Sequence, residues 1–306
     1  MALSIGQLDA ITHRYIMPKL YDAIFDSNPL LKRLMASGQY HSVPGGTYVE
    51  IPLAYAAGSA AWYQGTETLN TAELDQLTSA RYSWCNLATP ITISEEDELK
   101  NGGSAGVLKL LASKAMLAEK TIKDSMGTGL YSAGTDTKSI VGLRDVVAID
   151  QTVGGISQTD YSWWQGIVDS TTTTLSISAV NTVFENASVD SEKPTVIVSP
   201  RTPYTKYYNL LQPMQRFTDS ETAKGGFSNL LFNGIPWLVD SHAPASHVFG
   251  LNEKHLWLCY HPERNFTKTD FLTPINQRVK VCHILWMGAL GSSNNRLHFK
   301  MSGVAA

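Results

Sequence analysis

The hydrophobic residues at the start of the chain recur at the three- and four-residue steps of an amphipathic helix. This apolar stripe consists of Ile5, Leu8, Ile11, Tyr15, Ile16, Leu20 and Ile24. A second short helix should follow, with Ser27 as its N-cap, Pro29 just inside it and Gly38 at its end. Two small helices bury little apolar surface against each other. We therefore expect each helix to pack on a partner surface, either the main domain or another subunit.

Across residues 45–98 the pattern changes to two strand-like runs, TYVEIPLAY and SARYSWCNLATPITIS. The runs are separated by more than 20 residues that are rich in Gly, Ala, Thr and Gln. A connection of this length is unusual inside a compact domain and indicates a functional loop or a projecting arm. We therefore expect a long hairpin with an extended tip.

The strongest helical pattern begins at Ser104, directly after Gly102 and Gly103. Glu119 and Lys123 form a favourable i,i+4 pair on its polar side. A helix of about 25 residues spans about 40 Å, which is long enough to act as a backbone for the whole subunit. Its apolar positions are Val107, Leu111, Ala115, Ala118, Ile122, Met126 and Leu130.

Shorter elements follow this helix. The segment SIVGLRDVVAID predicts a strand or an edge element, and VGGISQTDYSWWQG predicts an aromatic-bearing loop. A helix over residues 176–187, the buried strand TVIVS and a helix opened by Ser199 and Pro200 then favour an α/β-like layer. From Leu230 onward most runs predict strands, namely LLFNGIPWLVD, KHLWLCY, QRVKVCHILWMGAL and RLHFKMSGV.

Composition excludes several classes of protein. Only 17% of the residues are charged, against about 25% in a typical globular chain. With a net charge of −3 the chain lacks the basic excess that drives tight nonspecific DNA binding. Cys85, Cys259 and Cys282 have no CxxC spacing, which favours a reducing compartment. We expect neither a signal peptide nor a membrane span, because no segment reaches the roughly 18 to 20 apolar residues that a span needs.

The sequence contains no nucleotide-binding loop, nucleophile elbow or HExxH motif. The acidic run from Glu95 to Glu98 could supply a carboxylate pair, but adjacent side chains diverge, so a solvated face is the better interpretation. Seven residues near the C-terminus have metal-binding side chains but match no zinc spacing, and we expect neither a metal nor a cofactor. These are His242, His247, His255, Cys259, His261, Cys282 and His283.

Four aromatic residues could stack on sugars or bases, but no cluster of Lys or Arg accompanies them. A protein–protein interface or local core is the better interpretation, because aromatic side chains are enriched at interfaces. They are Trp62, Tyr63, Trp163 and Trp164.

Several stretches resemble, in the same order, the major capsid proteins of tailed bacteriophages with the HK97-like fold. They are DAIFDSNPLLKRL, GGTYVEIPLAY, WYQGTETL, VGLRDVV with VGGISQTDYSWW, LFNGIPWLVDSHAP and ILWMGALGSSNNR. The resemblance implies an α+β fold with an N-terminal arm, an extended E-loop hairpin, a long spine helix in a P-domain and an A-domain of mixed sheet and helices. By position, it implies an N-arm at 1–44, an E-loop at 45–98, a P-domain at 99–174, an A-domain at 175–270 and closing strands at 271–306.

The resemblance also implies a function without catalysis. Members of this family assemble as hexamers and pentamers into an icosahedral virion shell around double-stranded DNA, in the cytoplasm of the bacterial host. Scaffolding, portal and decoration proteins are candidate partners, and packaged DNA lies nearby without specific binding. The residues expected at subunit interfaces are Trp62, Tyr63, Gln64, Glu67, Arg81, Tyr15 and Leu20.

Some relatives crosslink their shells through an E-loop lysine. This chain has no Lys between Lys32 and Lys100, so we expect noncovalent stabilisation of the shell. Two alternatives stay open at this stage. One is an encapsulin-like compartment with the same fold. The other is a soluble hydrolase or carbohydrate-binding module that uses the exposed aromatics and the acidic run at residues 95–98.

Overall fold

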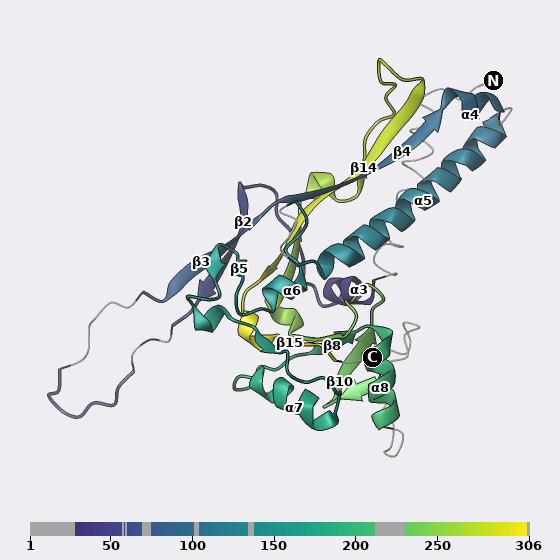
Figure 1. Ribbon diagram of the computed structural model, residues 1–306. Coiled ribbons are helices and arrows are strands. Elements are labelled where there is room, and N and C mark those ends of the chain that lie inside the picture. Colours follow the sequence, from purple (N-terminus) through teal and green to yellow (C-terminus); the bar gives the residue numbers. More distant parts are fainter. Residues whose placement is uncertain are drawn as a thin grey trace.

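A long helix and a long hairpin extend in different directions from a body that contains a five-stranded and a six-stranded sheet (Figure 1). The computed structural model describes residues 28–56, 58, 60–68, 75–100, 104–133, 138–211 and 230–304. The predicted first helix, with Tyr15 and Leu20, lies outside these residues. No helix among them is both long enough and apolar enough to span a membrane.

The first sheet has five strands and joins distant parts of the chain. Its order is β1 (Tyr40–Ser42), β12 (Leu256–Tyr260), β14 (Val279–Ser292) and β13 (Thr267–Lys268), and β4 (Cys85–Ser94) also pairs with β14. The pairing of β14 with β4 is antiparallel and runs from Val279 opposite Ser94 to Gly288 opposite Cys85. The C-terminal part of the chain therefore supports the strand that leads into the long helix.

That helix is α5 (Ser104–Leu130), which follows the short helix α4 (Glu95–Lys100). Its predicted apolar face is confirmed from the second turn onward, because Leu111, Ala115, Ala118, Ile122, Met126 and Leu130 are all buried. The predicted pair also forms, with Lys123 Nζ 2.6 Å from Glu119 Oε1. Before it in the chain, α3 (Pro29–Ala36) buries Leu30, Leu31 and Leu34 in the same apolar core.

The second sheet has six strands. Its order is β7 (Ile167–Asp169), β15 (Phe299–Ser302), β11 (His247–Leu251), β8 (Val196–Ser199), β10 (Ile235–Val239) and β9 (Leu230–Phe232). The predicted helices are confirmed as α7 (Ile177–Asn186) and α8 (Arg201–Leu210). The hydroxyl of Ser176 caps α7 by accepting from the Ala179 N–H at 3.1 Å. Both helices pack on this sheet around the buried Trp237.

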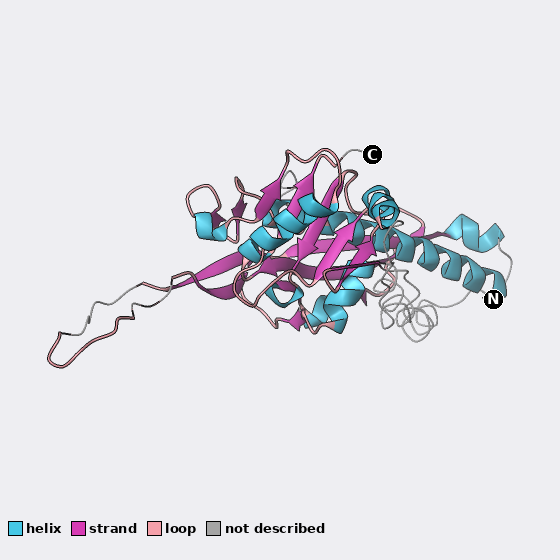
Figure 2. Ribbon diagram, turned by 90° about the horizontal axis from the view of Figure 1, so that it is seen from below, coloured by secondary structure: helices cyan, strands magenta, loops and turns pink. Residues whose placement is uncertain are grey.

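The predicted hairpin is also present. Strand β2 (Tyr48–Ala54) pairs antiparallel with β3 (Leu77–Ser83), from Tyr48 opposite Ser83 to Ala54 opposite Leu77. Every second residue of β2 is buried, which places one face of the hairpin root on the body. Figures 1 and 2 both show the hairpin and α4 at opposite ends of the molecule.

Some sequence-based predictions were wrong in detail. The N-cap of α3 is Asn28 rather than Ser27, because Pro29 is already the first helical residue. The segment around VGLRDVV is not a strand but the short helix α6 (Leu143–Val146). The run SARYSWCNLATPITIS is two strands, since the chain leaves one sheet at Ser83 and enters another at Cys85.

The predicted aromatic loop contains regular structure. It holds the small hairpin of β5 (Thr152–Val153) and β6 (Ile156–Ser157), and then the 3₁₀ turn η2 (Ser162–Trp164). Three further 3₁₀ turns, η3 (Glu253–His255), η4 (Pro262–Arg264) and η5 (Asn295–Leu297), lie between late strands.

Candidate assembly surface

The tip of the hairpin presents large aromatic side chains to solvent. The exposed fraction is 103% for Trp62 and 64% for Tyr63, so neither ring packs on the body of its own chain. Gln64 and Glu67 form a turn beside them, in which the Gln64 N–H donates to Glu67 Oε2 at 3.2 Å and the Glu67 N–H donates to the Gln64 carbonyl at 3.4 Å. Four of the expected interface residues therefore lie together on one protruding turn.

Arg81 lies elsewhere, at the root of the hairpin on β3. Its Nε is 2.9 Å from Oε1 of Glu50, the residue directly opposite on β2. Both side chains are more than half exposed, so this cross-strand pair contributes less than about 1 kcal/mol to stability. The backbone N–H of Arg81 donates to the Gly154 carbonyl at 2.8 Å. Arg81 thus belongs to the junction between hairpin and body rather than to the tip.

The root is anchored by residues that were not predicted. Tyr82 is 2% exposed, and its hydroxyl lies 3.0 Å from both the carbonyl oxygen and the N–H of Ser292 at the end of β14. Gly291 lies under the same ring, where a Cβ would meet Tyr82 and Ile51 at 2.9 Å or less. The alternation along β3 marks Tyr82 as an inward position, but nothing in the sequence identifies a partner 210 residues away.

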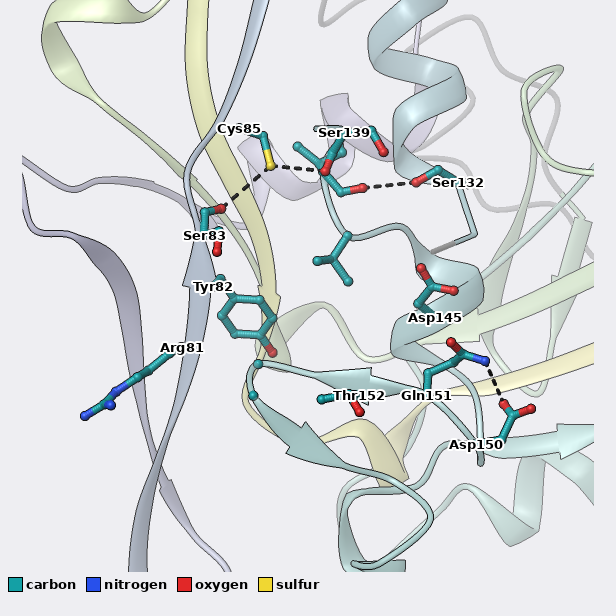
Figure 3. A pocket seen from close by; sticks show the side chains of 14 residues that line it. Arg81, Tyr82, Ser83, Cys85, Ser132, Ser139, Asp145, Asp150, Gln151 and Thr152 are labelled. Carbon is teal, nitrogen blue, oxygen red and sulfur yellow. Dashed lines mark hydrogen bonds between the residues drawn. The ribbon is translucent and has the colours of Figure 1, made fainter. Parts of the chain in front are cut away.

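A cavity of 550 Å³ opens beside this root, between β3, the segment after α5 and the β5–β6 hairpin (Figure 3). Its polar lining includes Asp145, Asp150 and the hydroxyls of Ser132 and Ser139, and Gln151 Nε2 donates to Asp150 Oδ1 at 3.1 Å. No histidine or lysine occurs among the described residues that line it.

The late histidines and cysteines do not form a metal site. Within the described part of the chain, no three His, Cys, Asp or Glu side chains converge in a way that could hold a metal ion. His242 faces Asp240 and Asp124 through its two different ring nitrogens, at 3.3 and 3.1 Å. The three cysteines are buried and form no disulfide with one another, and burial raises the pKa of the Cys259 thiol to about 11.

Two of the other aromatics proved to be core rather than surface. Trp164 is 1% exposed and its indole N–H donates to the Val153 carbonyl at 3.0 Å. Trp163 is partly buried and stacks with Tyr55, with ring centroids 5.2 Å apart. The stack of Trp163 on Tyr55 therefore joins the hairpin to the body, and of the four aromatics only Trp62 and Tyr63 at the tip are exposed.

No protein-family model and no curated protein matches the chain, but solved structures do. The capsid asymmetric unit of cyanophage A-1(L) is 13% identical with a TM-score of 0.68, over 87% of this chain and 90% of that chain. The capsid of a native GTA particle is 12% identical with a TM-score of 0.59, over 89% and 90%. The chain has the HK97-like capsid fold.

The HK97-like fold is not confined to phage particles in this comparison. The holo-SrpI encapsulin complex from Synechococcus elongatus is 10% identical with a TM-score of 0.60, over 89% of this chain and 88% of that chain. The likeness to both kinds of subunit therefore shows a shared fold.

In this HK97-like chain the acidic run lies on the first turn of α4, and the side chains of Glu95 and Glu96 are exposed. Glu95 Oε2 is 3.2 Å from Arg278 Nη1, and Glu96 Oε1 is 2.6 Å from Lys100 Nζ. Both carboxylates are more than half exposed and paired with a cation. The predicted solvated face is confirmed for these two residues, and the hydrolase alternative gains no support from them.

Proposed function

We propose that this chain is the major capsid protein of a tailed bacteriophage. Copies assemble as hexamers and pentamers into an icosahedral shell that encloses double-stranded DNA, and the chain has no catalytic role. The observation that carries the proposal is the likeness to phage capsid subunits over nearly the whole length of both chains. Assembly takes place in the cytoplasm of the bacterial host, with scaffolding, portal and decoration proteins as candidate partners.

The hairpin tip supplies a contact between copies. A fully exposed tryptophan beside a tyrosine is costly to leave in water, and aromatic residues of this kind dominate the binding energy of many interfaces. We assign Trp62, Tyr63, Gln64 and Glu67 to a neighbouring subunit's surface. Arg81 and Glu50 act indirectly by bracing the two strands that carry the tip.

The division of the chain follows the family pattern in this proposal. Residues 1–44 form the N-arm, with Tyr15 and Leu20 on its apolar stripe against a neighbour, and 45–98 form the E-loop. The P-domain at 99–174 is built on α5, the A-domain occupies 175–270, and 271–306 close the fold. The sheets support a closing role for the last segment, because β14 joins the five-stranded sheet and β15 joins the six-stranded one.

The experiment compares Trp62→Ser with Trp62→Phe and the natural chain. Each protein is expressed alone and together with the capsid-assembly proteins of a tailed phage. Particles are counted by negative-stain microscopy. We expect Trp62→Ser to reduce the particle yield at least tenfold and Trp62→Phe to retain most of it. As unassembled subunits, all three proteins should melt at the same temperature. Full assembly by Trp62→Ser would contradict the role of the tip.

An encapsulin-like compartment is the second candidate, and the likeness to the SrpI encapsulin favours keeping it. Both candidates predict closed shells, so the contents of the particles separate them. Nuclease-protected double-stranded DNA inside purified particles supports the phage head. Particles that are free of DNA but filled with one co-purifying protein support the compartment.

A further inference from the structure

A serine, a histidine and a glutamate from three distant parts of the chain form one hydrogen-bonded row at η3. Ser293 Oγ is 2.8 Å from His255 Nδ1, and Glu192 Oε2 is 3.0 Å from His255 Nε2. This row has the order of nucleophile, base and carboxylate that activates a serine hydroxyl in unrelated hydrolytic proteins. The order of the three residues along the chain differs among such proteins, so the geometry is what identifies the row.

The five-stranded sheet holds the serine next to the histidine. Strands β12 and β14 are paired antiparallel with Leu256 opposite Ser292, so the next pair of residues is His255 and Ser293. The Ser293 N–H donates to the His255 carbonyl at 3.0 Å, and the His255 N–H donates to the Asn252 carbonyl at 3.2 Å. The contact between the two side chains therefore rests on fixed backbone.

The glutamate fixes which nitrogen of the ring carries the proton. Its Oε1 is 2.5 Å from Lys254 Nζ, and Val189 and Glu192 exchange both backbone hydrogen bonds at 2.9 Å. The Lys254 ammonium, together with the His255 ring, holds the pKa of the Glu192 carboxyl below its ordinary value. An ionised carboxylate only accepts hydrogen bonds, so Nε2 of the neutral ring carries the proton. The lone pair on Nδ1 then faces the Ser293 hydroxyl and can take its proton.

A second serine–histidine pair next to the row lacks this property. Ser292 Oγ is 3.4 Å from His298 Nε2, and both residues are 0% exposed. His298 Nδ1 accepts the Asn252 N–H at 3.0 Å, so Nε2 carries the proton and the ring donates to Ser292. Ser293, by contrast, is partly exposed and faces an accepting nitrogen. Of the two adjacent hydroxyls, Ser293 is therefore the one that a reagent from solvent can reach in an activated state.

The surroundings favour a single modification over repeated turnover. The Ser293 N–H is bonded to the His255 carbonyl, and the Asn294 N–H donates to Ser292 Oγ at 3.3 Å. These two N–H groups are therefore not free to stabilise an oxyanion, which efficient turnover of an acyl intermediate depends on. An acyl group that reaches Ser293 is expected to stay there.

We propose that Ser293 is a site of covalent modification by activated acyl esters, with His255 as its base and Glu192 as the residue that orients the ring. Ser293 Oγ forms a bond to the acyl carbon, the bond from that carbon to the ester oxygen breaks, and the hydroxyl proton passes to His255 Nδ1. The alcohol portion leaves as its anion, and each chain is modified once. This inference goes beyond the proposed function and does not depend on shell formation.

The first test incubates the purified full-length chain with 4-nitrophenyl acetate and maps the acetylated residues by peptide mass spectrometry. We expect Ser293 to be acetylated at least tenfold faster than Ser178, a more exposed serine on α7, and buried Ser292 to stay unmodified. The preference for Ser293 should disappear when the chain is unfolded in urea. Equal acetylation of Ser293 and Ser178 in the folded chain overturns the inference.

The second test changes the base and the carboxylate. A positioned general base contributes about 10²–10⁴-fold to a rate. We therefore expect His255→Gln to slow acetylation of Ser293 at least tenfold and Glu192→Gln to slow it as well. Asp190→Asn, which removes one negative charge from the same exposed turn, is the matched control and should react at the natural rate.

Thermal melting shows whether each variant is folded, and the comparison of Ser293 with Ser178 decides the question in the natural chain even where a variant is not. A folded His255→Gln protein that reacts at the natural rate overturns the inference. The reaction is measured on unassembled subunits, so its failure leaves the proposed shell untouched, and a chain that forms no shells leaves this inference untouched.

Discussion

At the scale of single residues, Tyr82 determines how the hairpin joins the body. Its buried hydroxyl pairs with both backbone groups of Ser292, and burial raises the pKa of Tyr82 well above its ordinary value. Tyr82→Phe would leave a buried N–H and a buried carbonyl without this partner, at a cost of about 1–3 kcal/mol. Urea denaturation of the unassembled subunit should show that loss. Tyr48→Phe, whose ring is half exposed on the same hairpin, should change stability by less than about 0.5 kcal/mol.

His298 gives the subunit a defined sensitivity to acid. It is fully buried, accepts the Asn252 N–H at 3.0 Å, and burial lowers its pKa to about 3. The unfolded chain protonates this histidine at its ordinary pKa of about 6.5, so the unfolded state binds more protons between these values. The stability contributed by neutral His298 is therefore present above about pH 6.5 and declines by about 1.4 kcal/mol per pH unit towards pH 3.

Urea denaturation at pH 7 and pH 5 measures this dependence. His298→Gln should show a smaller difference between the two pH values than the natural chain, and His283→Gln, at an exposed position, should show the natural difference. NMR titration of the natural chain offers a check that needs no variant. A His298 ring that protonates above pH 5 in the folded protein would contradict the prediction.

At the scale of elements, α5 is joined to the loop after β10 by a close approach. A Cβ at Gly127 would lie 2.5 Å from the His242 ring, and that ring is held between Asp124 and Asp240. Gly127→Ala should therefore lower the free energy of unfolding by about 1–2 kcal/mol, even though alanine favours helix by about 1 kcal/mol. Thr128→Ala on the exposed side of the same turn is the matched control. A Gly127→Ala protein more stable than the natural chain would refute this account.

Elements with long, regular patterns could be predicted from the sequence. In the stripe from Leu111 to Leu130 and in the alternation of β2, the same face of the element is buried over many residues, so the pattern is visible in the sequence. Strand β11 was missed because HVFGL is short, and Gly250 in it lies against the ring of Phe299, a contact that sequence does not reveal. The change of sheet at Trp84 was missed because only this one residue separates two strand-like runs, although the buried positions shift there from Ala80 and Tyr82 to Cys85, Ile91 and Ile93. The tip aromatics were named correctly as exposed, but the anchor between Tyr82 and Ser292 depends on tertiary pairing.

At the scale of the whole molecule, the low charge of 17% agrees with a subunit that buries much of its surface against copies of itself. Hydroxyls, amides and aromatics cost less to desolvate than Lys or Glu. The hairpin and the 269–278 loop lie at opposite ends of the molecule, and both carry exposed apolar side chains.

We predict that the shell has no covalent links between subunits. Purified particles boiled in SDS should therefore run as a single band at 33.5 kDa, the mass of the chain. The reason is that the hairpin region has no lysine, since none occurs between Lys32 and Lys100. A ladder of higher bands from natural particles would show that a covalent link forms.

The central claim is that this chain builds a closed shell, and cryo-electron microscopy of the protein produced with its assembly partners tests it most directly. The predicted result is an icosahedral particle of hexamers and pentamers, with density for Trp62 and Tyr63 on a neighbouring subunit. Monomers of 33.5 kDa under every assembly condition, co-expression included, would contradict it.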